Sequence, residues 1–71
     1  MRLDARTLRN LEGRHVNVAL VDGTRIDDCQ LVSAGRPGTT TVWLYSGRDL
    51  FVRLADVIDL WESRSGARRA A

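Results

Sequence analysis

The strongest constraint on the fold is a strand pattern that ends in a tight turn. In the segment "RHVNVALVDGTRI", the apolar residues Val16, Val18 and Leu20 alternate with other residues, and Asp22 and Gly23 follow. Alternation of this kind is typical of a half-buried β-strand, and Asp-Gly is the strongest short-range signal for a hairpin turn. The segment therefore predicts a strand that turns back on itself, so the fold has to contain an antiparallel sheet.

The returning strand is expected over residues 24–32. Its apolar residues, among them Ile26 and Cys29, do not keep one phase along the strand. Because side chains alternate between faces, a change of phase requires a bulge or a sharp bend, and Asp27 and Asp28 lie where it is needed. We expect the strand to change direction there.

The hairpin is preceded by a helical pattern and followed by a loop. Leucines near helical intervals, with Asp4 as a cap and Gly13 as a terminator, predict a short helix over residues 5–12. Residues 33–40, "SAGRPGTT", combine glycine, proline and small polar residues and are predicted to form a loop.

Two further β-rich runs, "TVWLY" and "DLFVRL", are joined by Ser-Gly at residues 46–47 and predict a second hairpin. Both of its faces are apolar, so the sequence leaves open which face points inward. The two sets are Val42, Leu44 and Phe51 on one side, or Trp43 and Leu50 on the other. Either choice leaves hydrophobic surface exposed, which usually marks an interface.

The stretch "VRLADVIDL" is interpreted as the end of that hairpin, a one-turn connector at residues 54–56 and a last strand at residues 57–61. Residues 63–71 lack apolar periodicity and are expected to form a flexible basic tail. The predicted fold is mainly β: residues 1–62 form one domain, a short N-terminal helix followed by a five-stranded, strongly bent barrel of the SH3-like type.

A chain of 71 residues buries a small core and usually needs an additional source of stability. Cys29 is the single cysteine and His15 the single histidine, so neither an internal disulfide nor a structural zinc site is expected. Self-association is the remaining source of additional stability. We find no apolar run that could cross a membrane and no secretion leader, so the expected location is the cytoplasm.

The sequence offers no catalytic unit. His15 has no nucleophile or carboxylate at a suitable spacing, and the adjacent Asp27 and Asp28 point to opposite faces of an extended strand. We therefore expect a protein that is not an enzyme and that carries neither a metal nor a cofactor.

The charge is modest in sum but uneven along the chain. The formal net charge is +2, all eleven basic residues are arginines, and they gather toward both ends of the chain. Arginine suits bidentate contacts with phosphate and stacking on bases. A GC-rich genome that favours arginine and alanine codons is the alternative explanation.

The first hairpin resembles the first sequence motif of the Sm and Sm-like (LSm) proteins, whose bacterial branch is of the Hfq type. The matching positions in this motif are Leu11, Gly13, Arg14, Val16, Val18, Leu20, Asp22, Gly23 and Ile26. "VRLADVIDL" is similar to the second motif, with Val52, Arg53, Val57 and Leu60 in place. The sequence departs from the family pattern at Asp28 and Leu54, where the family has glycine, and at Ala34 and Gly38 in the loop.

The resemblance implies a ring of about six or seven identical subunits, joined through the fourth and fifth strands, that binds single-stranded RNA. The candidate RNA-binding residues are Arg53, facing the pore of the ring, together with Arg14 and Arg9. The candidate subunit-interface residues are Phe51, Val52, Val57 and Leu60. Because the base-contacting positions of the loop and the Lys-His pair of the Hfq branch are replaced, a base preference does not carry over.

Alternatives remain for these residues and for the whole chain. Arg53 could instead pair across a subunit boundary with Asp56 or Asp59, and isolated arginines such as Arg14 and Arg9 are commonly solvated. The exposed half of the set Trp43, Tyr45 and Phe51 could stack on bases, or these side chains could pack in a subunit interface or in the core. The chain could also be a protein-interaction or structural module that has lost its RNA pocket, or a barrel that works as a monomer or dimer.

Overall fold

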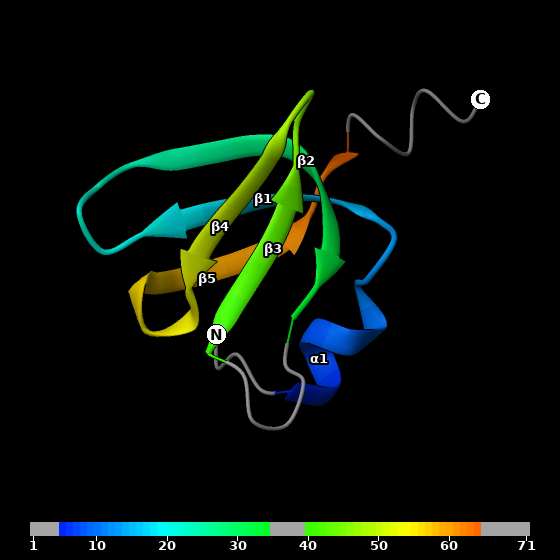
Figure 1. The fold of residues 1–71 in the computed structure, drawn as a ribbon, viewed down its shortest axis with the longest axis horizontal. Coiled ribbons are helices and arrows are strands. Elements are labelled where there is room, and N and C mark those ends of the chain that lie inside the picture. Colours follow the sequence, from blue (N-terminus) through cyan, green and yellow to red (C-terminus); the bar gives the residue numbers. More distant parts are fainter. Residues whose placement is uncertain (1–4, 35–39, 65–71) are drawn as a thin grey trace.

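The computed structural model describes residues 5–34 and 40–64, which form a short helix followed by five antiparallel strands in one sheet (Figure 1). The elements are α1 (Ala5–Asn10), β1 (His15–Leu20), β2 (Arg25–Ser33), β3 (Thr41–Tyr45), β4 (Asp49–Arg53), the 3₁₀ turn η1 (Leu54–Asp56) and β5 (Val57–Glu62). The mainly β prediction, with the helix first, is confirmed. The strand order is β4-β3-β2-β1-β5, and the sheet is open, with β4 and β5 as its two edges.

The helix ends earlier than the sequence pattern indicates. It stops at Asn10, because the N–H of Leu11 donates to the carbonyl oxygen of Leu8 at 3.1 Å, a tighter bond of the 3₁₀ type. Gly13, with a φ of 87°, then turns the chain toward β1. The expected cap, Asp4, lies outside the described residues.

The first hairpin forms at the predicted turn. The Asp22 carboxylate accepts a hydrogen bond from the backbone N–H of Thr24 at 2.9 Å, which lowers the pKa of Asp22. Gly23 has a φ of 89°, a conformation that glycine adopts without steric cost. These two residues therefore fix where β1 ends and β2 begins.

The predicted bulge in β2 is also present. Asp27 and Asp28 together lie opposite Asn17 alone, because the pairing of β1 with β2 shifts between Val16 and Val18. Asp28 has a φ of 54°, and its N–H donates to Oδ1 of Asn17 at 2.8 Å. The bulge lets β2 change the phase of its side chains and bend.

The second hairpin turns the side chains of Val42 and Leu44 into the core. Cross-strand partners share a face, and the pairs are Leu44 with Leu50 and Trp43 with Phe51. Both groupings offered by the sequence were therefore wrong, because Phe51 belongs with Trp43 on the outer face and Leu50 belongs with Leu44.

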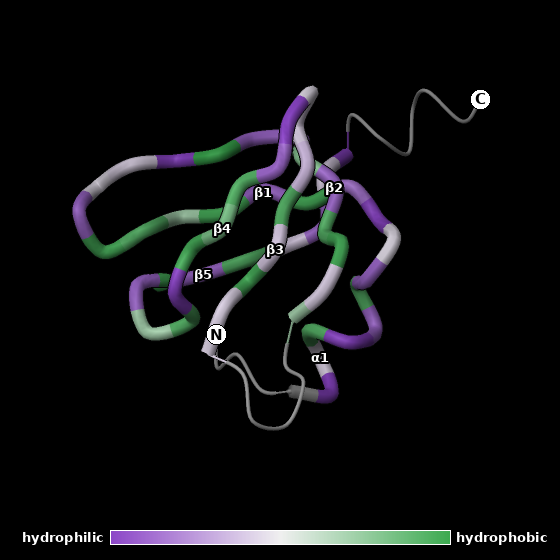
Figure 2. The backbone as a smooth tube through the Cα atoms, viewed as in Figure 1, coloured by the Kyte–Doolittle hydropathy of each residue, from purple (hydrophilic) through white to green (hydrophobic). Residues whose placement is uncertain are grey.

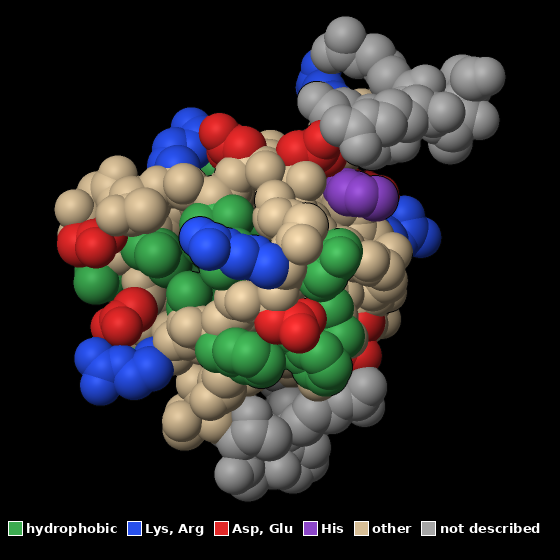
Figure 3. All heavy atoms as spheres, turned by 45° about the horizontal axis from the view of Figure 1, so that its top comes forward, with side chains coloured by type: hydrophobic (Ala, Val, Ile, Leu, Met, Phe, Trp, Pro, Cys, Tyr) green, Lys and Arg blue, Asp and Glu red, His purple; other side chains and the backbone are tan. Residues whose placement is uncertain are grey.

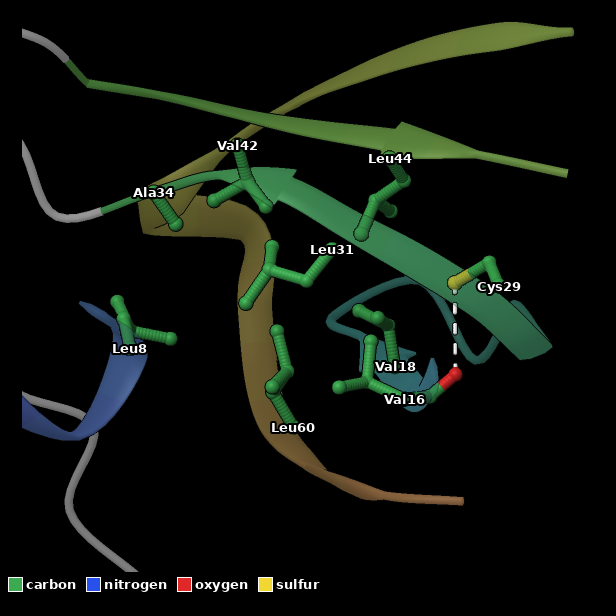
Figure 4. Packing of buried hydrophobic residues seen from close by; sticks show 9 residues of the cluster. All are labelled: Leu8, Val16, Val18, Cys29, Leu31, Ala34, Val42, Leu44 and Leu60. Atoms are coloured by element: carbon green, nitrogen blue, oxygen red, sulfur yellow. Dashed lines mark hydrogen bonds between the residues drawn. The ribbon is translucent and has the colours of Figure 1, made fainter. Parts of the chain in front are cut away.

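The core consists of small and aliphatic side chains drawn from α1, from four of the strands and from Ala34, which directly follows β2 (Figure 4). Its members are Leu8, Val16, Val18, Cys29, Leu31, Ala34, Val42, Leu44 and Leu60. The Cys29 thiol donates to the carbonyl oxygen of Val16 at 3.5 Å, and burial raises the pKa of this thiol. Figure 2 shows that hydrophobic residues are spread over the strands, with polar residues between them.

The ordered structure continues past β5. Ser63 is buried, its N–H donates to the carbonyl oxygen of His15 at 2.8 Å, and its hydroxyl donates to Asp28 Oδ1 at 3.0 Å. Ser63 was expected in the flexible tail, and residues 65–71 of that expected tail lie outside the described residues. Among residues 5–34 and 40–64, no helix has the length and apolar character required to span a membrane.

Candidate functional site

The three arginines predicted to bind RNA do not come together in one cluster. Arg53 ends β4, Arg14 directly precedes β1, and Arg9 lies in the last turn of α1. Figure 1 shows the end of β4 on the opposite side of the molecule from α1 and from the start of β1. Arg14 forms an exposed ion pair with Glu62 at 2.9 Å.

Arg53 is highly exposed and has a partner within the same chain. Its side chain is 76% exposed, and its Nε and Nη2 atoms donate to the two carboxylate oxygens of Asp56 at 3.2 and 3.4 Å. The other acid considered from the sequence, Asp59, accepts a hydrogen bond from the N–H of Leu60 at 2.8 Å. Arg53 is thus held at the end of β4 with its guanidinium facing solvent.

The four predicted interface residues occupy different environments. Phe51 projects from the outer face of β4 and is 63% exposed, Val52 and Val57 are half-buried against the core, and Leu60 is fully buried. The Leu60 side chain therefore belongs to the core of its own chain. Only the backbone of β5 could meet a neighbouring subunit at that position.

All four aromatic residues of the chain lie outside the core. Trp43 and Phe51 stack on the outer face with their ring centroids 5.7 Å apart and an angle of 25° between the rings. Trp43 Nε1–H donates to Asp49 at 3.0 Å, which fixes the orientation of the indole. Aromatic side chains usually supply much of a core, whereas here Trp43 and Phe51 form part of the exposed surface.

A second row of side chains crosses the sheet beside the stacked pair. Tyr45 pairs with Gln30 of β2 on one side and with Asp49 of β4 on the other, and Gln30 pairs with His15 of β1. A hollow of about 500 Å³ lies at this row. Its lining residues are His15, Asp27, Asp28, Gln30, Tyr45, Ser46 and Gly47.

Another hollow, of about 390 Å³, lies on the other side of the bulge and shares Asp27 and Asp28 with the first. There the guanidinium of Arg25 lies 5.2 Å from the ring centroid of Trp61 and forms an ion pair with Asp27 at 2.9 Å. Because Arg25 already covers the indole, this hollow offers less open aromatic surface than the one at Tyr45.

Charged groups interrupt the hydrophobic surface. Figure 3 shows exposed hydrophobic side chains on the visible face, with acidic and basic groups between them. Arg48 and Arg53 lie at the two ends of β4, before its first residue and at its last. In the part of the chain that the structure describes, no group of three or more His, Cys, Asp or Glu side chains could hold a metal ion.

Comparison with protein-family models, with curated proteins and with solved structures finds no match to this chain. The row formed by His15, Gln30 and Tyr45 was not predicted from the sequence. The alternation of Trp43 and Tyr45 within β3 was the signal that could have indicated it.

Proposed function

We propose that this protein is a cytoplasmic, Sm-like, single-stranded RNA-binding protein that works as a homo-oligomeric ring of about six or seven subunits. The observation that carries the proposal is the outer face of the second hairpin, where Trp43, Tyr45 and Phe51 are 37%, 45% and 63% exposed. Stacking of a base on such a side chain contributes ~1–3 kcal/mol and tolerates any base. Arg53, on the same face, supplies a cation for the RNA backbone.

The bulge of β2 supports the Sm-like part of the proposal. Asp28, with its φ of 54°, stands where the Sm pattern has glycine, the residue that adopts this conformation most easily. The leading helix and the bent second strand fit the same pattern. In this proposal the bent sheet corresponds to a small barrel of the Sm/SH3-like type.

The two edges of the sheet support self-association. Unpaired edge strands attract other strands, and joining β4 of one copy to β5 of the next is a head-to-tail contact that forms a ring when the rotation closes. The half-buried Val52 and Val57 lie on these two strands. Native mass spectrometry tests this part, and a monomer at every concentration examined would remove the ring from the proposal.

RNA binding is tested by fluorescence anisotropy with short single-stranded oligonucleotides at ~50 mM salt, where phosphate contacts are strongest. We expect Phe51→Ala to weaken binding ~5- to 150-fold, from the stacking energy of one base. The matched control is Ile58→Ala, since Ile58 is 57% exposed and lies on β5, outside the aromatic face. Equal affinities for wild type and Phe51→Ala would exclude this face.

The salt dependence reports the contribution of Arg53. Removing one phosphate contact from a single strand should lower the slope of log affinity against log salt by ~0.7. We expect this change for Arg53→Ala but not for Arg25→Ala, a variant of an arginine that is ion-paired on β2. An unchanged slope would remove Arg53 from the site.

The pairing of Arg53 with Asp56 favours a second candidate function, a protein-interaction module, because a paired guanidinium is less available to phosphate. In that case the exposed aromatic face would bind a protein partner. Copurification of one specific protein, without absorbance from nucleic acid at 260 nm, would support this function over RNA binding.

A further inference from the structure

We propose that the hollow beside Tyr45 binds and reads a single adenine base of the RNA. The inference rests on the proposed RNA binding and adds a base preference and the residues that produce it. It concerns the row formed by His15, Gln30 and Tyr45, which lies next to the stacked pair of Trp43 and Phe51.

The row is built by three neighbouring strands. Gln30 is paired with His15 on one side and with Tyr45 on the other, so the three side chains lie on the same face of the sheet. Across residues 5–34 and 40–64, no hydrogen bond engages the side chain of any of the three. Their polar groups are therefore available to a ligand in the hollow.

The chemistry of these side chains suits adenine. Tyr45 is 45% exposed, and its ring provides a surface on which a base can stack. The carboxamide of Gln30 can donate to N7 of adenine and accept from its N6 amino group, the pairing that a glutamine makes most readily with a base. Carboxylates of Asp27 and Asp28 also line the hollow and disfavour the carbonyl-rich edge of uracil.

The charges around the hollow define how the RNA backbone runs. Asp27 and Asp28 repel phosphate, so the hollow accepts a base rather than the backbone. Arg48 and Arg53 flank β4, and phosphates that follow β4 would lie near both. Bases then point across β3, one onto Phe51 and its neighbour onto Tyr45.

The spacing of the two rows fits consecutive nucleotides. Trp43 and Tyr45 are two residues apart on β3, which corresponds to ~7 Å along the strand. Neighbouring bases of an extended single strand reach this separation when they are unstacked from each other. The polar lining of the hollow also favours a base over the apolar anchor residues that dominate protein interfaces.

The test uses the wild-type protein and oligouridine hexamers that carry one substituted nucleotide, measured by fluorescence anisotropy. We expect the oligomer with one adenine to bind ~5- to 150-fold more tightly than the one with uracil, the discrimination of one bidentate pair. Replacing that adenine with 7-deazaadenine removes the N7 acceptor and should abolish most of the preference. This comparison needs no variant, so it does not depend on how a substitution affects folding.

Variants identify the residues responsible. We expect Gln30→Ala to bind the adenine and uracil oligomers with equal affinity, because the side chain that distinguishes the two bases is removed. Ser33→Ala is the matched control, since Ser33 pairs with Trp43 in the neighbouring row and does not line the hollow. The Ser33→Ala variant should still bind the adenine oligomer more tightly than the uracil oligomer.

The outcomes separate this inference from the function on which it rests. Equal affinity for all four bases, or an adenine preference that survives both 7-deazaadenine and Gln30→Ala, overturns the adenine site and leaves RNA binding in place. Failure to bind any oligonucleotide refutes the proposed function and this inference with it.

Discussion

Replacing Asp28 with glycine and with alanine separates the backbone cost of the β2 bulge from the contacts of the Asp28 side chain. Asp28 has a φ of 54°, and the left-handed conformation costs an ordinary residue ~1–2 kcal/mol, a cost that glycine does not carry. Both variants lose the hydrogen bond from the Ser63 hydroxyl and keep the bond from the backbone N–H to Asn17. The difference in stability between the two variants therefore measures the cost of the backbone conformation at residue 28.

We expect Asp28→Ala to be less stable than Asp28→Gly by ~1–2 kcal/mol. For a domain of this size that difference corresponds to ~4–15 °C in Tm. Ser63→Ala removes the same hydrogen bond without changing the backbone of β2 and should cost ~1–3 kcal/mol, because the acceptor is a partly buried carboxylate. The stability of Asp28→Gly should lie between the stabilities of Ser63→Ala and the wild type, because glycine removes the cost of the left-handed backbone and this offsets part of the lost hydrogen bond.

Urea unfolding followed by far-UV circular dichroism measures these differences, with the protein concentration held constant because self-association would add to the apparent stability. The glycine and alanine variants should have the same m-value and differ in midpoint. An alanine variant as stable as the glycine variant would refute the left-handed bulge, and with it one support for the Sm-like proposal.

Three further predictions concern packing, the thiol and the surface. Leu31→Ala should lower the free energy of unfolding by ~2–5 kcal/mol, measured in the same urea experiment, because Leu31 is fully buried. Cys29 should react with iodoacetamide only as the chain unfolds. Burial raises the pKa of its thiol above the ordinary 9.0, so the free energy of unfolding should be retained below pH 9.0 and should fall as the pH rises through the higher pKa of the folded state. Removing the exposed ion pair with Arg14→Ala or Glu62→Ala should change stability by less than ~1 kcal/mol, a change that 0.5 M salt should reduce in thermal melts.

The features predicted well from the sequence are those set by neighbours along the chain. Asp22 and Gly23 specify their own turn, because both the Asp22 carboxylate and the φ of Gly23 act within that turn. The change of phase after Ile26 was visible in the sequence and appears as the bulge at Asp27 and Asp28. Local chemistry was sufficient at each of these positions.

The faces of the second hairpin depended on the pairing of two strands and could not be read from either strand alone. Val42 and Leu44 were correctly placed together, since residues two apart share a face. Phe51 was placed with them in error, because the turn sets a register in which Phe51 meets Trp43. A prediction of the turn geometry would have been needed to assign that face.

The candidate site required even more long-range information. The row of His15, Gln30 and Tyr45 depends on the registers of two strand pairs, and each pair contains a shift. A shift of one residue would move Gln30 to the other face of the sheet. Arg53 could be proposed from the sequence because it lies in a stretch that resembles a known motif, whereas nothing in the chain near Gln30 indicates its neighbours.

The distribution of aromatic residues bears on how the binding tests are to be interpreted. The core is completed by aliphatic side chains such as Leu31 and Leu44, although burying one phenylalanine would contribute ~1.5–3 kcal/mol to a small fold. Phe51 nevertheless lies outside the core and is 63% exposed, so its truncation removes little packing from the folded chain. A loss of binding in Phe51→Ala should therefore occur without a matching loss of stability, and the aromatic face can be tested separately from the core.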